Sequence, residues 1–287
     1  MACKICGNLT QEAGSKVGKW KPREFHLRRC PACQFAYISD PVIDYAEVYS
    51  SDYYNGRGAD PLVDYVFELE FPGKTIRLHE WQGIQQVIAS LHNFDLSTNW
   101  LDFGCGNGGL VRHCRDACRI VGFESSSWMR DKAREHRIPI LGEGDLAPLA
   151  GSFDIVTAIE VLEHVDDPVE VLRAIRRLLK PGGLFFYTTG NAQPHRKNLI
   201  EWPYVLPETH ISFFEPDTLC RALRAAGFRP EFRDYLPGHT DIIRFKVLKN
   251  LRQLKRAAWH DLVPWQLLAP LIDSRVKITR HPIAWAE

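Results

Sequence analysis

Short apolar runs alternate with helix-length segments from Asn99 onward, and this alternation constrains the fold more than any other feature of the chain. The segments between the runs carry apolar residues at helical spacing. Strands that alternate with helices are typical of βαβ units, whose strands lie parallel in one sheet. The sequence therefore predicts an α/β fold with a doubly wound sheet. The runs are NWLDF at 99–103, RIVGFE at 119–124, IPIL at 138–141, FDIVTAI at 153–159 and GLFFYTT at 183–189.

The stretch DFGCGNGG, residues 102–109, follows the first of these runs and predicts a ligand-binding turn. Glycines let the chain turn sharply and let its backbone approach a ligand, which suits either a dinucleotide or S-adenosylmethionine. Asp102 ends the strand, where its carboxylate would repel a pyrophosphate but can face an ammonium group. Glu124 ends the next strand and can accept hydrogen bonds from the ribose hydroxyls of either cofactor. Asp102 therefore favours S-adenosylmethionine.

Four cysteines near the start form two pairs, Cys3 with Cys6 in CKIC and Cys30 with Cys33 in CPAC. Each pair can supply two thiolates, and together they can complete the tetrahedral shell that Zn²⁺ prefers. Residues 1–40 are too few to bury a core of their own, so we expect a zinc ribbon with a structural metal. Two disulfides are the alternative, disfavoured in a reducing compartment. The role of the ribbon stays open between docking, closure over a substrate and stability.

Residues 41–98 are expected to form a linker and an N-terminal helix. The first part, 41–73, is rich in tyrosine, proline and glycine, which suits an irregular segment whose rings pack on another part of the protein, or a lid. The second part carries an apolar stripe at helical spacing that faces the core. The stripe consists of Ile76, Trp81, Ile84, Val87, Ile88 and Leu91.

Residues 241–260 carry six lysines and arginines against one aspartate, and they predict a basic amphipathic helix. We expect this helix to pack on its own domain, with contact to an anionic membrane or an acidic ligand as the alternative. We assign 241–275 to a basic helical insertion and 276–287 to a final strand. The apolar stripe expected on the helix consists of Ile243, Val247, Leu251, Leu254 and Ala258.

The order of five motifs between residue 99 and about residue 236 resembles that of class I S-adenosylmethionine-dependent methyltransferases. The motifs are LDFGCGNG, VGFE, GDLAPL, SFDIVTAIEVLEHVDDP and LLKPGGLFFYTT. The resemblance implies a Rossmann-like core over residues 99–240. The ribbon and HISFFEPDTL resemble a branch that methylates small molecules such as sugars, quinone precursors and natural-product intermediates, whereas the basic insertion departs from it. The cofactor-binding residues that the resemblance implies are Asp102, Gly104, Cys105, Gly106, Glu124, Ser125, Asp145, Leu146 and Glu160.

Two histidines are candidates for the base that methylation of a hydroxyl group requires. The side chain best matched to proton transfer at neutral pH is imidazole. His164 and His210 both follow strands at their carboxyl ends, where ligands bind in open α/β sheets. His164 can instead be a structural histidine that binds the backbone. The long loop 190–214 is the expected acceptor wall, through Asn191, His195, Trp202, Tyr204 and Glu208.

The cluster of Glu160, Glu163 and His164 raises the question of a second metal, because it could hold Mg²⁺ and orient an acceptor. Some quinone-pathway relatives with a similar run imply such a site. The alternative is that Glu160 faces the cofactor and Glu163 caps the following helix.

Composition limits the remaining partners. The chain has 36 basic and 35 acidic residues, so a nucleic-acid partner is not expected. No apolar run reaches the length of about 18 residues that a transmembrane helix needs, and no signal-peptide pattern occurs at the N-terminus. We expect a cytoplasmic protein with a small-molecule substrate; a homodimer or peripheral membrane contact is compatible with the sequence.

Two other functions stay open. Zinc ribbons and basic helices also accompany RNA methyltransferases, but AIEVLEHV at 158–165 stands where enzymes that methylate base amino groups carry a proline-rich run. A binding protein without turnover is the third hypothesis, and the intact glycine loop with Glu124 argues against it.

Overall fold

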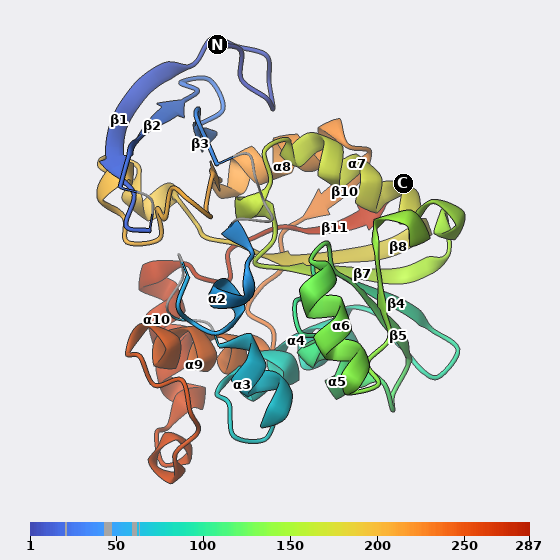
Figure 1. Ribbon diagram of the computed structural model, residues 1–287. Coiled ribbons are helices and arrows are strands. Elements are labelled where there is room, and N and C mark those ends of the chain that lie inside the picture. The colour runs from blue at the N-terminus through green and yellow to red at the C-terminus, as the bar shows by residue number, and fades with distance from the viewer. Residues whose placement is uncertain (21, 43–47, 59–61, 63) are drawn as a thin grey trace.

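The computed structural model describes residues 1–20, 22–42, 48–58, 62 and 64–287. A seven-stranded sheet with helices on both faces forms the main body, and a small four-stranded sheet packs beside it (Figure 1). This arrangement confirms the predicted doubly wound α/β class.

The large sheet has the strand order β10-β11-β8-β7-β4-β5-β6. The five strands from β4 to β8 pair in parallel, whereas β11 pairs antiparallel with both β8 and β10. Successive strands are added on one side of β4 up to β6 and on its other side from β7 onward, so the strand order reverses between β4 and β7. Ligands bind at such a switch point in open sheets. The strands are β4 (Asn99–Phe103), β5 (Arg119–Phe123), β6 (Ile140–Leu141), β7 (Phe153–Ile159), β8 (Leu179–Thr188), β10 (Phe228–Glu231) and β11 (Ile283–Ala286).

Alternate residues of the central strands supply two hydrophobic cores. On β8, Leu184 and Phe186 face one core, whereas Phe185 and Tyr187 face the other, as the two-residue period of a strand requires. The first core is covered by α4 (Arg77–Leu91), α5 (Gly109–Cys114), α6 (Ser127–Glu135) and α9 (His239–Asn250). The second is covered by α7 (Pro168–Leu178) and α8 (Pro216–Ala225).

The N-terminal ribbon shares its sheet with the main body. Its strands are β1 (Gln11–Val17), β2 (Glu24–Arg29) and β3 (Ala36–Ile38), and β3 pairs with β9 (Ser212–Phe213). Figure 1 shows the blue ribbon lying against the yellow segment that follows β8. The predicted boundary at residue 40 is therefore crossed by strand pairing.

The segment expected to be a linker contains two short helices, α2 (Ser51–Tyr54) and α3 (Tyr65–Glu70). Its rings pack as predicted: Tyr54 stacks on Trp128 of α6 with ring centroids 5.6 Å apart. Parts of the predicted lid, residues 43–47, 59–61 and 63, lie outside the described residues.

The prediction of one basic helix over 241–260 is wrong, because α9 ends at Asn250. The backbone beyond it bonds instead to the segment before α4: Leu254 accepts from the Ile76 N–H, and the Arg256 N–H donates to Lys74. The predicted apolar stripe is consequently not buried as one face of a helix, and the Leu251 side chain is 61% exposed. The apolar residues that α9 buries are Ile242, Ile243, Phe245 and Leu248.

A second helix, α10 (Trp265–Val276), completes the insertion, and α9 lies between α4 and α10. Its Leu267 and Leu271 side chains are exposed. Among the described residues, we find no helix with the length and apolar character needed to cross a bilayer.

Candidate active site

The turn between β4 and α5 needs glycine at several positions, and Gly104 and Gly106 are the two that bear on the site. Gly104 and Gly106 have φ angles of 73° and 54°, in the left-handed region that glycine favours. A Cβ atom at Gly104 would lie 2.6 Å from a methyl group of Val161, and one at Gly106 would lie 2.9 Å from the Tyr65 ring. At these positions the turn therefore has backbone without side chains, in close contact with Val161 and the Tyr65 ring.

Asp102 lies at the end of β4, where it is buried and accepts a hydrogen bond of 2.8 Å from the Thr157 hydroxyl. Burial raises the pKa of Asp102 to about 7; the Thr157 hydrogen bond opposes this, and the charges of Glu80 and Glu124 add to it. A cationic ligand beside this carboxyl group would favour its charged form.

Glu124 ends β5 and reaches the glycine turn. Its carboxylate accepts from the Gly106 N–H at 3.0 Å and from the Ser126 N–H at 2.8 Å, and the Ser125 hydroxyl donates to it at 3.3 Å. The structure thus brings together the predicted residues Asp102, Gly104, Cys105, Gly106, Glu124 and Ser125.

Asp145 and Leu146 do not line the same cavity. Asp145 is exposed in a 3₁₀ helix (Glu143–Asp145) after β6, where its carboxylate accepts from the Gly142 N–H at 2.8 Å. Leu146 packs partly buried against the core under α7 and α8. Their predicted adenine-side role stays a prediction.

Residues of α3 and α4 that sequence analysis missed close the cavity behind the turn. Arg77 donates to Glu68 at 2.9 Å and to Glu80 at 2.7 Å, and all three side chains are buried. Arg77 and Glu80 line this cavity with Tyr65 and Trp81, and its volume is about 50 Å³, room for one or two waters. The signal was present as two charged residues, Arg77 and Glu80, next to the apolar stripe of the helix.

A larger cavity of about 440 Å³ lies next to the first, and Arg77 lines both. One wall is a stack of rings from the loop after β8. The centroid distances are 4.5 Å for His195 with Trp202, 4.6 Å for Trp202 with Tyr204, and 4.3 Å for Tyr204 with His210. This wall and Asn191 match the predicted acceptor loop.

Glu208 was expected in the same wall, but among the described contacts it faces the ribbon. Its carboxylate accepts from the Trp20 N–H at 2.9 Å, and the side chain is only 4% exposed.

Glu160 borders the larger cavity in a strained conformation. Its φ of 54° is unusual for a non-glycine residue. The carboxylate accepts from Lys246 at 2.7 Å, Thr188 at 2.9 Å and Tyr204 at 3.2 Å. Burial raises the pKa of Glu160, but the Lys246 ammonium outweighs burial and leaves the pKa below its ordinary value. Glu160 is therefore a fixed negative charge beside the cavity.

Glu163 is buried beneath the ring wall and is not a helix cap. Its carboxyl group accepts from Tyr204 and, at 2.8 Å, from Thr189. Asp167 caps α7 instead, through the N–H groups of Val169 and Glu170. Burial, with the charge of Glu160 as the second cause, raises the pKa of Glu163 to about 8.

The two candidate bases lie side by side, with ring centroids 4.8 Å apart. His210 lines the larger cavity, and its Nδ1 donates to the Tyr204 carbonyl at 2.7 Å. A neutral ring in this tautomer carries its lone pair on Nε2, the form of a general base. His164 binds the Thr209 carbonyl at 3.0 Å and the Tyr49 hydroxyl at 2.9 Å through Nδ1, the backbone contact of its structural alternative.

The four N-terminal cysteines converge as a zinc site requires. Their sulfur atoms all lie within 4.8 Å of one another, and the shortest distances are 3.4 Å for Cys6 with Cys30 and 3.5 Å for Cys3 with Cys33. A disulfide bond is about 2.05 Å long, so all four thiols are free. The set fits a tetrahedral zinc ion with four thiolate ligands.

The predicted magnesium set is not assembled. The Glu160 carboxylate is paired with the Lys246 ammonium. The residues whose possible ligand atoms lie within 4.8 Å of one another are Glu163, His164 and His210. Two imidazole nitrogens suit transition metals, whereas Mg²⁺ prefers oxygen ligands. The donor set does not fit magnesium.

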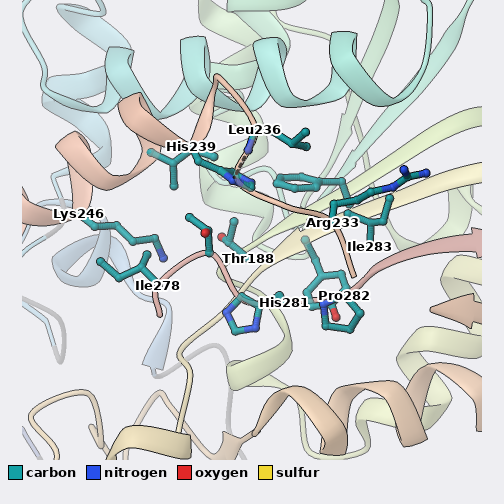
Figure 2. Close-up of a pocket in the computed structure, with 13 residues that line it drawn as sticks. Thr188, Arg233, Leu236, His239, Lys246, Ile278, His281, Pro282 and Ile283 are labelled. Carbon is teal, nitrogen blue, oxygen red and sulfur yellow. Dashed lines mark hydrogen bonds between the residues drawn. The ribbon is translucent and has the colours of Figure 1, made fainter. Parts of the chain in front are cut away.

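Lys246 also borders a third cavity, which Figure 2 shows between the start of α9 and the chain before β11. His239 and His281 face it from opposite sides, and the Leu236 N–H donates to His239 at 3.1 Å. Burial lowers the pKa of both histidines to about 4. Its volume is about 30 Å³, similar to that of the cavity behind the glycine turn.

Comparison with known proteins gives a family match over more than half of the chain. The model of a methyltransferase domain matches residues 73–231. Two similar proteins are ubiquinone biosynthesis O-methyltransferases. The one from Bordetella pertussis is 31% identical over 209 residues, 66% of this chain and 82% of that protein. The one from Pseudomonas aeruginosa is 32% identical over 139 residues, and the match spans 40% of this chain but only 60% of the relative.

Solved structures share the fold at low sequence identity. A complex of the Haloferax volcanii Trm112 methyltransferase activator with a methyltransferase matches at a TM-score of 0.52 and 20% identity, covering 77% of this chain and 95% of the solved one. A Haemonchus contortus phosphoethanolamine N-methyltransferase bound to S-adenosylhomocysteine matches at 0.50 and 15%, covering 85% and 59%.

Proposed function

Because the chain belongs to the methyltransferase-domain family, we propose that it transfers the methyl group of S-adenosylmethionine to a hydroxyl group of a small ring compound. One observation carries the proposal: a cavity on the glycine turn and a ring-walled cavity with His210 are neighbours that share Arg77. The acceptor class we propose is a sugar, a quinone precursor or a natural-product intermediate. The relatives named above methylate oxygen in ubiquinone biosynthesis, which favours the quinone-like member.

The donor side fits S-adenosylmethionine through the bare backbone of the turn and its two carboxylates. We propose that Asp102 faces the ammonium group and that Glu124 accepts from the ribose hydroxyls. The Tyr65 ring covers Gly106 and would move aside as the nucleoside enters. When bound, the cofactor supplies an electrophilic methyl carbon on a sulfonium group.

The acceptor side requires orientation and removal of one proton. We propose that the ring wall of His195, Trp202 and Tyr204 stacks on the acceptor and keeps water away. His210 takes the hydroxyl proton on Nε2 while the oxygen forms its bond to the methyl carbon, and the sulfur keeps the electron pair of the broken bond. The Glu160 carboxylate, paired with Lys246 at 2.7 Å, accepts from Tyr204 at 3.2 Å, and we propose that it holds this ring of the wall in place.

A direct test uses the purified chain, methyl-labelled S-adenosylmethionine and a panel of phenols, catechols, sugar nucleotides and carrier-bound intermediates. We expect label transfer to at least one ring hydroxyl. Transfer only to RNA, with steep salt dependence, would replace the proposal by the RNA alternative. If calorimetry shows binding of NADH but no binding heat with S-adenosylmethionine or its demethylated product, the proposed cofactor is wrong.

The remaining expectations stay predictions. Cytoplasmic localisation and a homodimer have no support in the contacts described above. Peripheral membrane contact, for which the exposed Leu267 and Leu271 of α10 are candidates, stays a prediction as well.

A further inference from the structure

We propose that the zinc ribbon is a positioning device for the acceptor wall, so that the ribbon controls acceptor binding while the donor half of the site stays intact. The inference rests on the proposed function, because it assigns the ring-walled cavity to the acceptor. It also closes a question that the cysteine pattern leaves open, which is what a ribbon of this size does for the protein.

The ribbon and the acceptor segment form one hydrophobic core. Phe25 and Leu27 of β2 and Ile38 of β3 are fully buried against residues of the segment after β8. The residues that this segment contributes are Ala192, Leu199, Val205, Ile211 and Phe213. Neither part has this core without the other, so the conformation of the segment depends on the ribbon.

Backbone pairing brings the ribbon next to the candidate base. In the pairing of β3 with β9, Tyr37 lies opposite Ser212, and the Ile38 N–H donates to the Ile211 carbonyl at 2.9 Å. The Ile211 N–H in turn donates to the Glu163 carbonyl at 2.7 Å. The residue directly after His210 is thus held between the ribbon and the loop after β7.

Side chains of the ribbon hold the rest of the wall. The Lys16 ammonium on β1 donates to the carbonyls of Ile200 at 3.2 Å and Trp202 at 3.4 Å. The Trp20 N–H donates to Glu208, two residues before His210. The Lys16 bonds hold the backbone at one end of the stretch that carries Trp202 and His210, and the Trp20 bond holds the Glu208 side chain near its other end.

The cysteine cluster stands at the base of this support. Cys30 and Cys33 form the turn between β2 and β3, where the Cys30 N–H donates to the Phe35 carbonyl at 2.8 Å. The Cys33 carbonyl accepts from Thr218 of α8 at 2.6 Å, which ties the turn to the main body. A zinc ion would bind this turn to Cys3 and Cys6, and its loss would release the hairpin that supports the wall.

Hydrogen exchange on the zinc-loaded and chelated protein tests the inference without any assay of turnover. We expect chelation to raise amide exchange in the ribbon and in residues 199–213 by at least tenfold, while β4, β5 and β7 keep their protection. The affinity for S-adenosylhomocysteine, measured by calorimetry, should change by less than twofold. Equal loosening of the large sheet, or an acceptor segment that stays protected, would overturn the inference.

The substitution Lys16→Met tests the same link with the metal in place, and Lys19→Met is its control, because Lys19 is exposed on the same ribbon. With an acceptor from the panel, we expect Lys16→Met to raise its KM about tenfold at nearly unchanged donor affinity, and Lys19→Met to leave both unchanged. Equal effects of the two variants, or a loss of donor affinity in Lys16→Met alone, would contradict a positioning role. If no acceptor is methylated, the proposed function fails, and the exchange experiment still decides the role of the ribbon.

Discussion

The donor half and the acceptor half of the site are built on different principles. The donor half comes mainly from the ends of two adjacent strands and one glycine turn, residues 102–109 with Glu124. The acceptor half is assembled from the loop after β8, the end of β7, helix α9 and, through its support, the ribbon. Local sequence therefore determines the turn and the two carboxylates of the donor half, whereas long-range packing determines its back wall and the acceptor half.

The comparison predicts that a substitution in one half impairs turnover or donor binding but not both. The largest effect is expected from His210→Ala. Loss of the base should lower kcat by about 10² to 10⁴. Affinity for S-adenosylhomocysteine should change by less than twofold, because His210 is not among the residues that line the donor cavity. Steady-state kinetics and calorimetry on the same preparations check this. Unchanged turnover would remove His210 from the mechanism.

The opposite result, a loss of donor binding, is expected from Gly104→Ala. The new Cβ would lie 2.6 Å from Val161 at a φ of 73°, so the turn must deform. We expect donor-product affinity to fall about 10- to 100-fold, equivalent to about 1.4 to 2.7 kcal/mol. Gly73→Ala is a matched control, because its Cβ would meet open space and the residue lies outside the predicted cofactor-binding motifs. Similar losses in both variants would show that the turn is not the donor site.

The pH dependence of donor binding sharpens the assignment of Asp102. The pKa of this carboxyl group is raised to about 7 by burial, and only its charged form attracts an ammonium group. Affinity for S-adenosylhomocysteine should therefore rise with pH, by up to about tenfold per unit below pH 7, and level off above it. Calorimetry from pH 5.5 to 8.5 measures this. Asp102→Asn should bind more weakly and lose the dependence; a profile equal to that of the unaltered protein would reject the contact.

The same contrast explains how much the sequence could predict. The bounds of strands β4 and β7 were predicted to the residue, because an apolar run and the residues that end it are local signals. The convergence of the four cysteines was also predictable, since metal chemistry fixes their spacing. Lys246 was expected on a solvated basic face, yet its partner Glu160 lies 86 positions earlier in the chain. Patterns within one segment carry no information about such a partner.

The predicted end of helix α9 at residue 260 was wrong for the same reason. The apolar stripe continues in the sequence through Leu254, but backbone bonds to Lys74 and Ile76 bend the chain after Asn250. Propensity and periodicity are weak where tertiary hydrogen bonds compete with the helix. Arg77 and Glu80 show the complementary failure, because a charged pair on a helix is ordinarily interpreted as surface.

The smallest effect on binding and turnover is expected from Glu163→Gln, because this buried residue lies beneath the wall and its substitution changes the pH dependence of stability instead. A carboxyl group has a pKa near 4.5 in the unfolded chain, whereas burial and Glu160 raise that of Glu163 to about 8 in the folded protein. Between these values the folded state holds a proton that the unfolded state has lost, so this group lowers stability as pH rises. Glutamine does not titrate, so the variant should gain relative stability across this window by up to about 1.4 kcal/mol per pH unit. Denaturant unfolding at pH 5, 6.5 and 8 measures the gain, with the exposed Glu170→Gln as control. A difference that does not change with pH would mean that Glu163 is charged in the folded protein, and the wall would then rest on an ion rather than on a neutral hydrogen-bond partner.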